Sequence, residues 1–117
     1  MEIQAEPLCR RQVICMDFMK ESTKDLLTYD YDATLPTFWL LEGLIMYMSK
    51  PAVTQMINEI VDLSVKGSCI CLMYMNGPEG NAANIDYIEA FLFEKGWRGK
   101  QECFGGNVIN YGRWPAD

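Results

Sequence analysis

A single carboxylate, Glu42, lies inside an apolar run that extends from Leu35 to Met48. Burying an ionised carboxylate without partners is costly, so such a residue either reaches a surface or binds something. The residues just before it, 37–41, are β-branched, aromatic or aliphatic and predict a strand buried on both faces, which Gly43 ends. Glu42 would then stand at the carboxyl end of a strand, where open α/β sheets bind ligands. A side chain that caps the turn or faces solvent is an equally good interpretation of its position.

A second carboxylate, Asp17, follows the short apolar run 12–16, which predicts another strand. A third strand is predicted over 68–75. The carboxyl ends of parallel strands meet at one edge of a sheet, so we expect Asp17 and Glu42 to lie along the same edge. Carboxylates there can accept hydrogen bonds from an amine or a ribose while apolar neighbours flank a ring, which suits a nucleoside. Acids at strand ends are common in α/β proteins, so this pattern by itself is weak.

Composition excludes several classes of function. The chain has 117 residues, enough for one domain, and a net charge of −6 without clustered Lys or Arg, which argues against nucleic acid and anionic membranes as partners. The chain contains no histidine, so Ser-His and Cys-His catalysis cannot occur within it. The five cysteines predict buried, reduced thiols, and Cys69 and Cys71 lack the further ligands of a zinc site. We expect a cytoplasmic protein with no signal peptide and no membrane span.

The elements that must position the two carboxylates follow from periodicity and capping. Ser22 can cap a short helix over 22–27, and a polar connection follows to residue 36. Ser49 and Pro51 begin an amphipathic helix that closes near Gly67, because its apolar residues recur with helical spacing. After a turn-rich loop over 76–81, Ile85 to Leu92 predict another helix, ended by Gly96. Residues 97–104 predict a more polar strand, and 105–117 a loop or short helix. Alternating strands and helices predict a parallel α/β sheet.

Five motifs make the chain similar to a known family. The run Leu35-Pro-Thr-Phe-Trp-Leu-Leu-Glu-Gly-Leu-Ile-Met-Tyr-Met48 closely resembles the PT-x-x-x-x-EGL-x-x-Y-[LM] signature of the leucine carboxyl methyltransferase family, which uses S-adenosyl-L-methionine. The resemblance covers about residues 12–115. Its other parts are Val13-Ile-Cys-Met-Asp-Phe18 (V-x-x-D-L), Ser64-Val-Lys-Gly-Ser68 (LS-x-x-GS), Glu94-Lys-Gly-Trp97 (GW) and Tyr111-Gly-Arg113 (YGR).

The resemblance implies roles for three residues. Asp17 and Phe18 would hold the adenine end of the cofactor, and Glu42 would lie near its methionine moiety. Phe18 departs from the usual Leu of the motif. The pair Glu42-Gly43 is the form found in the less-characterised bacterial-type members, whereas the protein phosphatase methyltransferases carry Glu followed by Cys. A phosphatase carboxyl terminus is therefore not the acceptor we expect.

The resemblance also implies that parts of the fold are missing. The glycine-rich loop after the first family strand, the acid after the second and the basic amino-terminal helices have no counterpart here. The family sheet has the order 3-2-1-4-5-7-6, of which we expect strands 3, 4, 5 and 6. The predicted fold class is thus α/β: one partial Rossmann-like methyltransferase domain over 1–117 with flanking helices, lacking the first two strands and the glycine-rich loop. We expect the carboxyl-side part of an enzyme, with unpaired strand edges.

The leading functional hypothesis is methyl transfer from S-adenosyl-L-methionine to an oxygen nucleophile, a small-molecule or protein carboxylate, in the intact fold. Such a transfer needs mainly alignment, so it requires no histidine. For the chain alone we expect little cofactor affinity and no activity. The alternative is a non-catalytic, degenerate methyltransferase module that pairs with another chain, or with itself, through exposed strand edges. An unrelated small nucleotide-binding α/β domain is the third interpretation.

Overall fold

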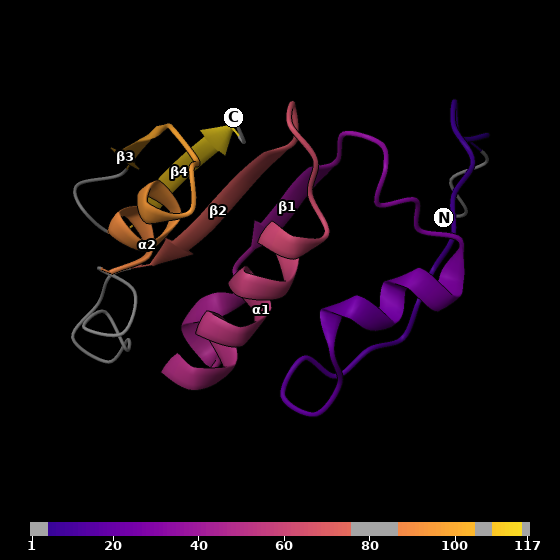
Figure 1. Cartoon of the computed structure of the whole chain (residues 1–117), viewed down its shortest axis with the longest axis horizontal. Helices are drawn as coiled ribbons and strands as arrows, with labels where there is room; N and C mark the ends of the chain where they lie inside the picture. The colour runs from indigo at the N-terminus through magenta and orange to yellow at the C-terminus, as the bar shows by residue number, and fades with distance from the viewer. Residues whose placement is uncertain (1–4, 76–86, 105–108, 116–117) are drawn as a thin grey trace.

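The structure is a computed structural model that describes residues 5–75, 87–104 and 109–115 (Figure 1). Two short 3-10 helices, η1 (Thr23–Tyr29) and η2 (Ile45–Tyr47), flank the first strand, β1 (Phe38–Glu42). The remaining elements are α1 (Lys50–Asp62), β2 (Cys69–Met75), α2 (Ile88–Glu94), β3 (Lys100–Phe104) and β4 (Ile109–Pro115). The predicted loop over 76–81 and the predicted helical residue Ile85 lie outside the described residues.

The sheet has four strands in the order β1-β2-β4-β3. β1 and β2 are parallel, as predicted, but β4 runs antiparallel to both β2 and β3, so the sheet is mixed. The prediction of a loop or short helix over 105–117 is therefore wrong for residues 109–115. They pair with β2 because its second edge would otherwise leave backbone donors and acceptors unbonded. When β1, β2, β3 and β4 are matched to family strands 4, 5, 6 and 7, the observed order corresponds to the 4-5-7-6 part of the family order that the resemblance implied.

The predicted strand over 12–16 is also wrong. These residues form no strand and pair with no other described segment. Their side chains alternate as in a strand: Ile14 and Met16 are half-buried, whereas Val13 is 78% exposed. In the expected order, two further strands separate this segment from β1, and the described residues supply neither. Without a neighbour to accept its backbone hydrogen bonds, the segment stays extended but unpaired.

The existence of the predicted helices is confirmed, although α1 ends at Asp62, before the predicted end near Gly67, and α2 is described over Ile88–Glu94. Ser49 caps α1 by accepting the backbone N–H of Ala52, Pro51 lies in the first turn, and the buried residues of α1 repeat with helical spacing: Val53, Met56, Ile57 and Ile60. The predicted helix over 22–27 is η1, a tighter 3-10 helix capped by Ser22. Figure 1 shows α1 and α2 in front of the sheet, so both helices cover the same face.

The core lies between that face and the two helices. Alternate residues of the strands point into it, among them Leu41 of β1 and Ile70, Leu72 and Tyr74 of β2. On the other face, Phe38 is 56% and Leu40 is 54% exposed. The prediction that β1 is buried on both faces is thus wrong, because no described helix covers the second face.

The cysteines divide between the core and the surface. Cys71 is buried and Cys69 half-buried, as expected of strand residues, but Cys9 and Cys15 are exposed, so the prediction of buried thiols is wrong for these two. The described residues contain no cluster of Cys, Asp and Glu that could hold a metal ion. None of the helices in the described ranges combines the length and apolar composition needed to cross a bilayer.

Candidate functional site

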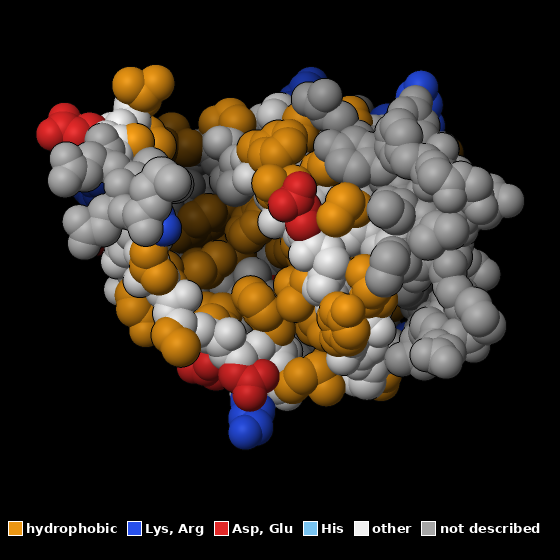
Figure 2. Space-filling model, turned by 180° about the vertical axis from the view of Figure 1, so that it is seen from behind, with side chains coloured by type: hydrophobic (Ala, Val, Ile, Leu, Met, Phe, Trp, Pro, Cys, Tyr) orange, Lys and Arg blue, Asp and Glu red, His pale blue; other side chains and the backbone are white. Residues whose placement is uncertain are grey.

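A pocket of about 380 Å³ lies between the amino-terminal segment and the free edge of β1. We call it the edge pocket. Figure 2 shows an apolar hollow on the face of the molecule opposite to α1, beside the amino-terminal segment. The lining comes from four parts of the chain: Ile14, Met16 and Phe18; Thr23 and Leu26 of η1; Trp39, Leu40, Leu41, Glu42 and Leu44 in and after β1; and Ile60 of α1. The volume and the apolar walls fit a small organic ligand.

Glu42 is the charged residue among those that line the edge pocket. It is the last residue of β1, opposite Met73 of β2, and its side chain is exposed. The prediction that Glu42 ends a strand is therefore confirmed. Gly43 follows with a φ of 61°, in the left-handed region that favours glycine, and its N–H donates to the Met73 carbonyl at 2.9 Å. Within the described residues, no hydrogen bond ties the Glu42 carboxylate to the turn, so it is free to meet a ligand.

Phe18 lies in the same pocket as Glu42, although the two belong to separate segments. Its ring is half-buried and packs against the hydrophobic core. Ile14, Met16 and Phe18 are spaced two residues apart and all line the pocket, because the segment is extended and alternate side chains share one side. In the sequence, this period-two spacing of apolar residues indicates which side chains form this wall of the pocket. The structure thus brings together two of the three predicted site residues.

Asp17, the third predicted site residue, does not line the edge pocket. Its carboxylate accepts the N–H of Met19 at 3.0 Å and lies 3.8 Å from the Lys20 Nζ. Its own N–H donates to the Glu21 carboxylate at 2.6 Å. Asp17 therefore closes a local turn at the surface, and the two predicted strand-end carboxylates do not form a pair along one sheet edge.

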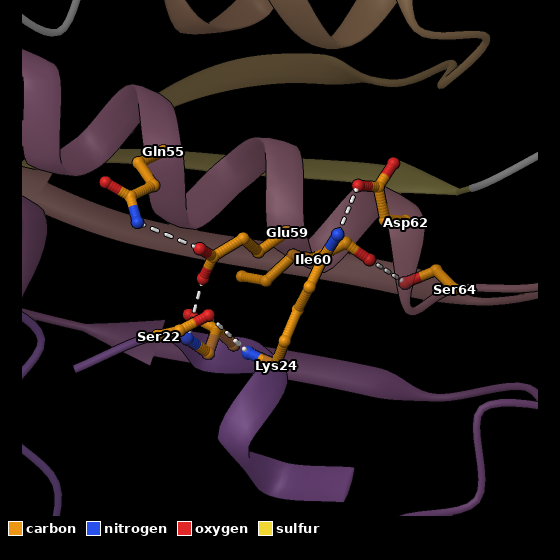
Figure 3. Close-up of polar contacts among 8 residues, drawn as sticks. Ser22, Lys24, Gln55, Glu59, Ile60, Asp62 and Ser64 are labelled. Carbon is orange, nitrogen blue, oxygen red and sulfur yellow. Dashed lines mark hydrogen bonds and ion pairs between the residues drawn. The ribbon is translucent and has the colours of Figure 1, made fainter.

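Sequence reasoning missed Glu59, the residue that fastens one wall of the pocket. Figure 3 shows the Glu59 carboxylate between α1 and η1. Its Oε2 accepts the backbone N–H of Thr23 at 2.6 Å, and its Oε1 accepts the Gln55 Nε2 at 3.0 Å. Nearby, the Lys24 Nζ lies 2.9 Å from the Asp62 carboxylate. These contacts hold η1, and with it the pocket residues Thr23 and Leu26, against α1. In the sequence, Glu59 could have been found as a carboxylate that adjoins the apolar face of the predicted helix, next to Ile60.

The charges at this anchor reflect their hydrogen bonds. Partial burial would by itself raise the pKa of Glu59, but hydrogen bonds from Gln55, Ser22 and Thr23 together outweigh it and hold the pKa below the usual value of 4.5. The hydrogen bond and the charge of Asp62 raise the pKa of Lys24 above its usual value. Both groups are therefore ionised near neutral pH.

Comparison with known proteins adds a family match. The family model described as leucine carboxyl methyltransferase matches residues 1–61, a stretch that includes Phe18, Glu42 and Glu59.

Several curated relatives are similar over parts of the chain. A protein of Mycobacteroides abscessus named "Putative S-adenosyl-L-methionine-dependent methyltransferase" is 29% identical over 101 residues, which are 86% of this chain and 31% of that protein. A protein of Streptomyces coelicolor with the same description is 38% identical over 68 residues, covering 58% of this chain and 22% of the relative. A protein of Mycolicibacterium smegmatis with a similar description is 32% identical over 73 residues, which are 62% of this chain and 24% of that protein. The chain thus spans less than a third of the length of these three relatives.

Proposed function

This chain belongs to the leucine carboxyl methyltransferase family, and we propose that it contributes one side of an S-adenosyl-L-methionine site used for methyl transfer to oxygen. The names of the curated relatives described above call them S-adenosyl-L-methionine-dependent methyltransferases. The observation that carries the proposal is that Phe18 and Glu42, both within the matched stretch, line one apolar pocket.

The residues of the edge pocket suit the parts of this cofactor. The apolar wall and the Phe18 ring can pack against the adenine, and the Glu42 carboxylate can accept hydrogen bonds from the ammonium of the methionine moiety. Asp17 is held in its own turn outside the pocket, so it has no role in this proposal. In the proposed site Glu42 binds and orients the cofactor and does not act as a base.

The bound cofactor supplies a methyl group that its sulfonium already activates. The protein then has to exclude water and align the donor with a nucleophile. We propose a carboxylate oxygen of a small molecule or a protein as the acceptor. This chemistry agrees with a chain that has no histidine, because neither donor nor acceptor needs an imidazole base.

Protein-observed NMR tests the proposal on the chain as it is. Titration with S-adenosyl-L-methionine should shift the backbone amide signals of Phe18, Glu42 and Leu44, with an affinity in the millimolar range because one chain supplies only part of the site. Glu42→Gln should weaken binding at least about tenfold, since a hydrogen bond to a charged group contributes about 1.5–3 kcal/mol.

The matched control is Glu89→Gln, which removes an exposed carboxylate on α2, away from the pocket. It should leave the affinity unchanged. Shifts that avoid Phe18 and Glu42, or equal effects of the two substitutions, would remove Glu42 from the proposed site.

A further inference from the structure

Trp39 of β1 lines the edge pocket and is half-buried against the core. Its indole N–H is the single donor of the side chain, and it donates to the Ser64 Oγ at 2.9 Å. The Ser64 hydroxyl in turn donates to the Ile60 carbonyl at 2.5 Å (Figure 3). Ile60 lines the pocket as well. Ser64 therefore joins a wall from β1 to a wall from α1, although it does not itself line the pocket.

A second contact holds the same indole from the connection that precedes β1. The ring centroids of Tyr31 and Trp39 are 5.6 Å apart, and the ring planes are tilted by 41°. This distance is within the range of favourable aromatic pairs. The Tyr31 hydroxyl donates to the Leu63 carbonyl at 2.9 Å and lies 2.7 Å from the Thr37 Oγ1. Trp39 is thus held through its donor and against one ring, and both contacts lead to the residues that follow α1.

The orientation of the Trp39 indole decides the shape of the pocket on the β1 side. The ring is wide and turns about two side-chain bonds, so another rotamer would move it by several ångströms. Side chains of a binding site are held in a productive geometry by hydrogen bonds from residues behind them. Without an acceptor, the half-buried indole N–H would lose its partner, and the ring would gain by turning toward water. The Ser64 hydroxyl therefore selects the orientation that the structure shows.

We propose that Ser64 is a positioning residue of the cofactor site. Its hydroxyl holds the Trp39 indole in the pocket wall, against which the apolar part of S-adenosyl-L-methionine packs. Ser64 does not touch the cofactor in this arrangement and acts only through Trp39. This role rests on the proposed function, and it extends the site to a residue outside the pocket.

Thr54 of α1 provides a matched control for a purely structural role. Its hydroxyl donates to the Lys50 carbonyl at 2.9 Å and lies 2.7 Å from the Tyr87 hydroxyl. Like Ser64, Thr54 is half-buried and joins a carbonyl four residues earlier to an aromatic side chain. Thr54 does not line the edge pocket. Thr54→Val and Ser64→Ala therefore remove hydroxyls of the same kind, and we expect both to lower stability by a similar amount.

NMR separates the position of the indole from the stability of the fold. The chain has three tryptophans, and Trp39→Phe identifies which indole N–H signal belongs to Trp39. In the chain without cofactor, Ser64→Ala should move this signal and speed its exchange with water. It should also weaken S-adenosyl-L-methionine binding about fivefold, the effect expected from one neutral hydrogen bond. Ser64→Thr keeps the hydroxyl and should restore both, whereas Thr54→Val should change neither.

Three results would overturn the positioning role of Ser64. They are an unmoved Trp39 signal in Ser64→Ala, an unchanged affinity despite a moved signal, and an equal loss of affinity in Thr54→Val. Urea unfolding confirms that each variant is folded. If the native chain itself binds no cofactor, the proposed function fails and the role of Ser64 falls with it. Binding to the native chain that Ser64→Ala leaves unchanged overturns the role of Ser64 alone, so the two failures are distinguishable.

Discussion

The Oε2 atom of Glu59 lies 2.6 Å from the backbone nitrogen of Thr23, and this hydrogen bond joins α1 to η1. Thr23 is buried although it opens a helix whose other residues are mostly exposed. The first N–H groups of a helix have no partner within it, so a carboxylate from a neighbouring helix satisfies one of them. A wall of the edge pocket thus depends on a residue of α1 that does not itself line the pocket.

Glu59→Gln should lower the free energy of unfolding by about 1–2 kcal/mol, because hydrogen bonds to a charged acceptor become weaker neutral ones and the new amide faces the donor of Gln55. Urea unfolding measures the change. Glu89→Gln, at an exposed position, should change stability by less than about 0.5 kcal/mol. Equal stabilities of the two variants would show that the Thr23 contact contributes nothing.

The stabilisation from Glu59 should depend on pH. Its pKa is lowered in the folded chain, so the folded state favours the ionised form, and the contribution is complete above the usual value of 4.5. It is lost as the pH falls through the lower, folded pKa. The stability difference between the native chain and Glu59→Gln should therefore be constant near neutral pH and shrink in acid. Urea unfolding over a pH series tests this, and a difference that grows in acid would contradict it.

Gly43→Ala should lower the free energy of unfolding by about 1–2 kcal/mol, because Gly43 has a φ of 61° and this conformation is unfavourable for a residue with a side chain. Space is not the cause, since the nearest atom to an added Cβ would be the Met46 Cε at 4.0 Å. Gly43→Asn is the matched variant: asparagine tolerates the left-handed region better, so its loss should be smaller. Thermal unfolding compares the two, and a larger loss for Asn would point to crowding instead.

Phe18→Ala should abolish most of the amide shifts that S-adenosyl-L-methionine induces at Glu42, because the ring forms part of the pocket wall. Phe38→Ala is the control. It removes a ring that is 56% exposed on the uncovered sheet face and does not line the pocket. NMR titration of both variants gives the comparison, after unfolding measurements confirm that each is folded. Loss of the shifts in Phe38→Ala alone would place the ligand on the sheet face.

Local patterns predicted the helices and three strands, β1, β2 and β3, correctly. Ser49, Pro51 and the apolar spacing of Val53 to Ile60 lie within α1 itself, so they specify that helix without distant contacts. The motif around Glu42 also predicted the strand end and the family, since both depend on adjacent residues. The methyltransferase resemblance could therefore be recognised before any coordinates.

Which segments become strands also depends on whether a neighbouring strand is there to pair with them, and local patterns do not show this. Residues 12–16 look like a strand but lack a neighbour, whereas 109–115, interrupted by Gly112 and Arg113, pair along the whole of β2. A strand needs hydrogen bonds from a distant segment, so its formation depends on which segments are there to pair. The tertiary structure also separated the three predicted site residues. The sequence by itself determined that Glu42 ends a strand; the tertiary structure decided that Phe18 shares its pocket and that Asp17, held by its own turn, does not.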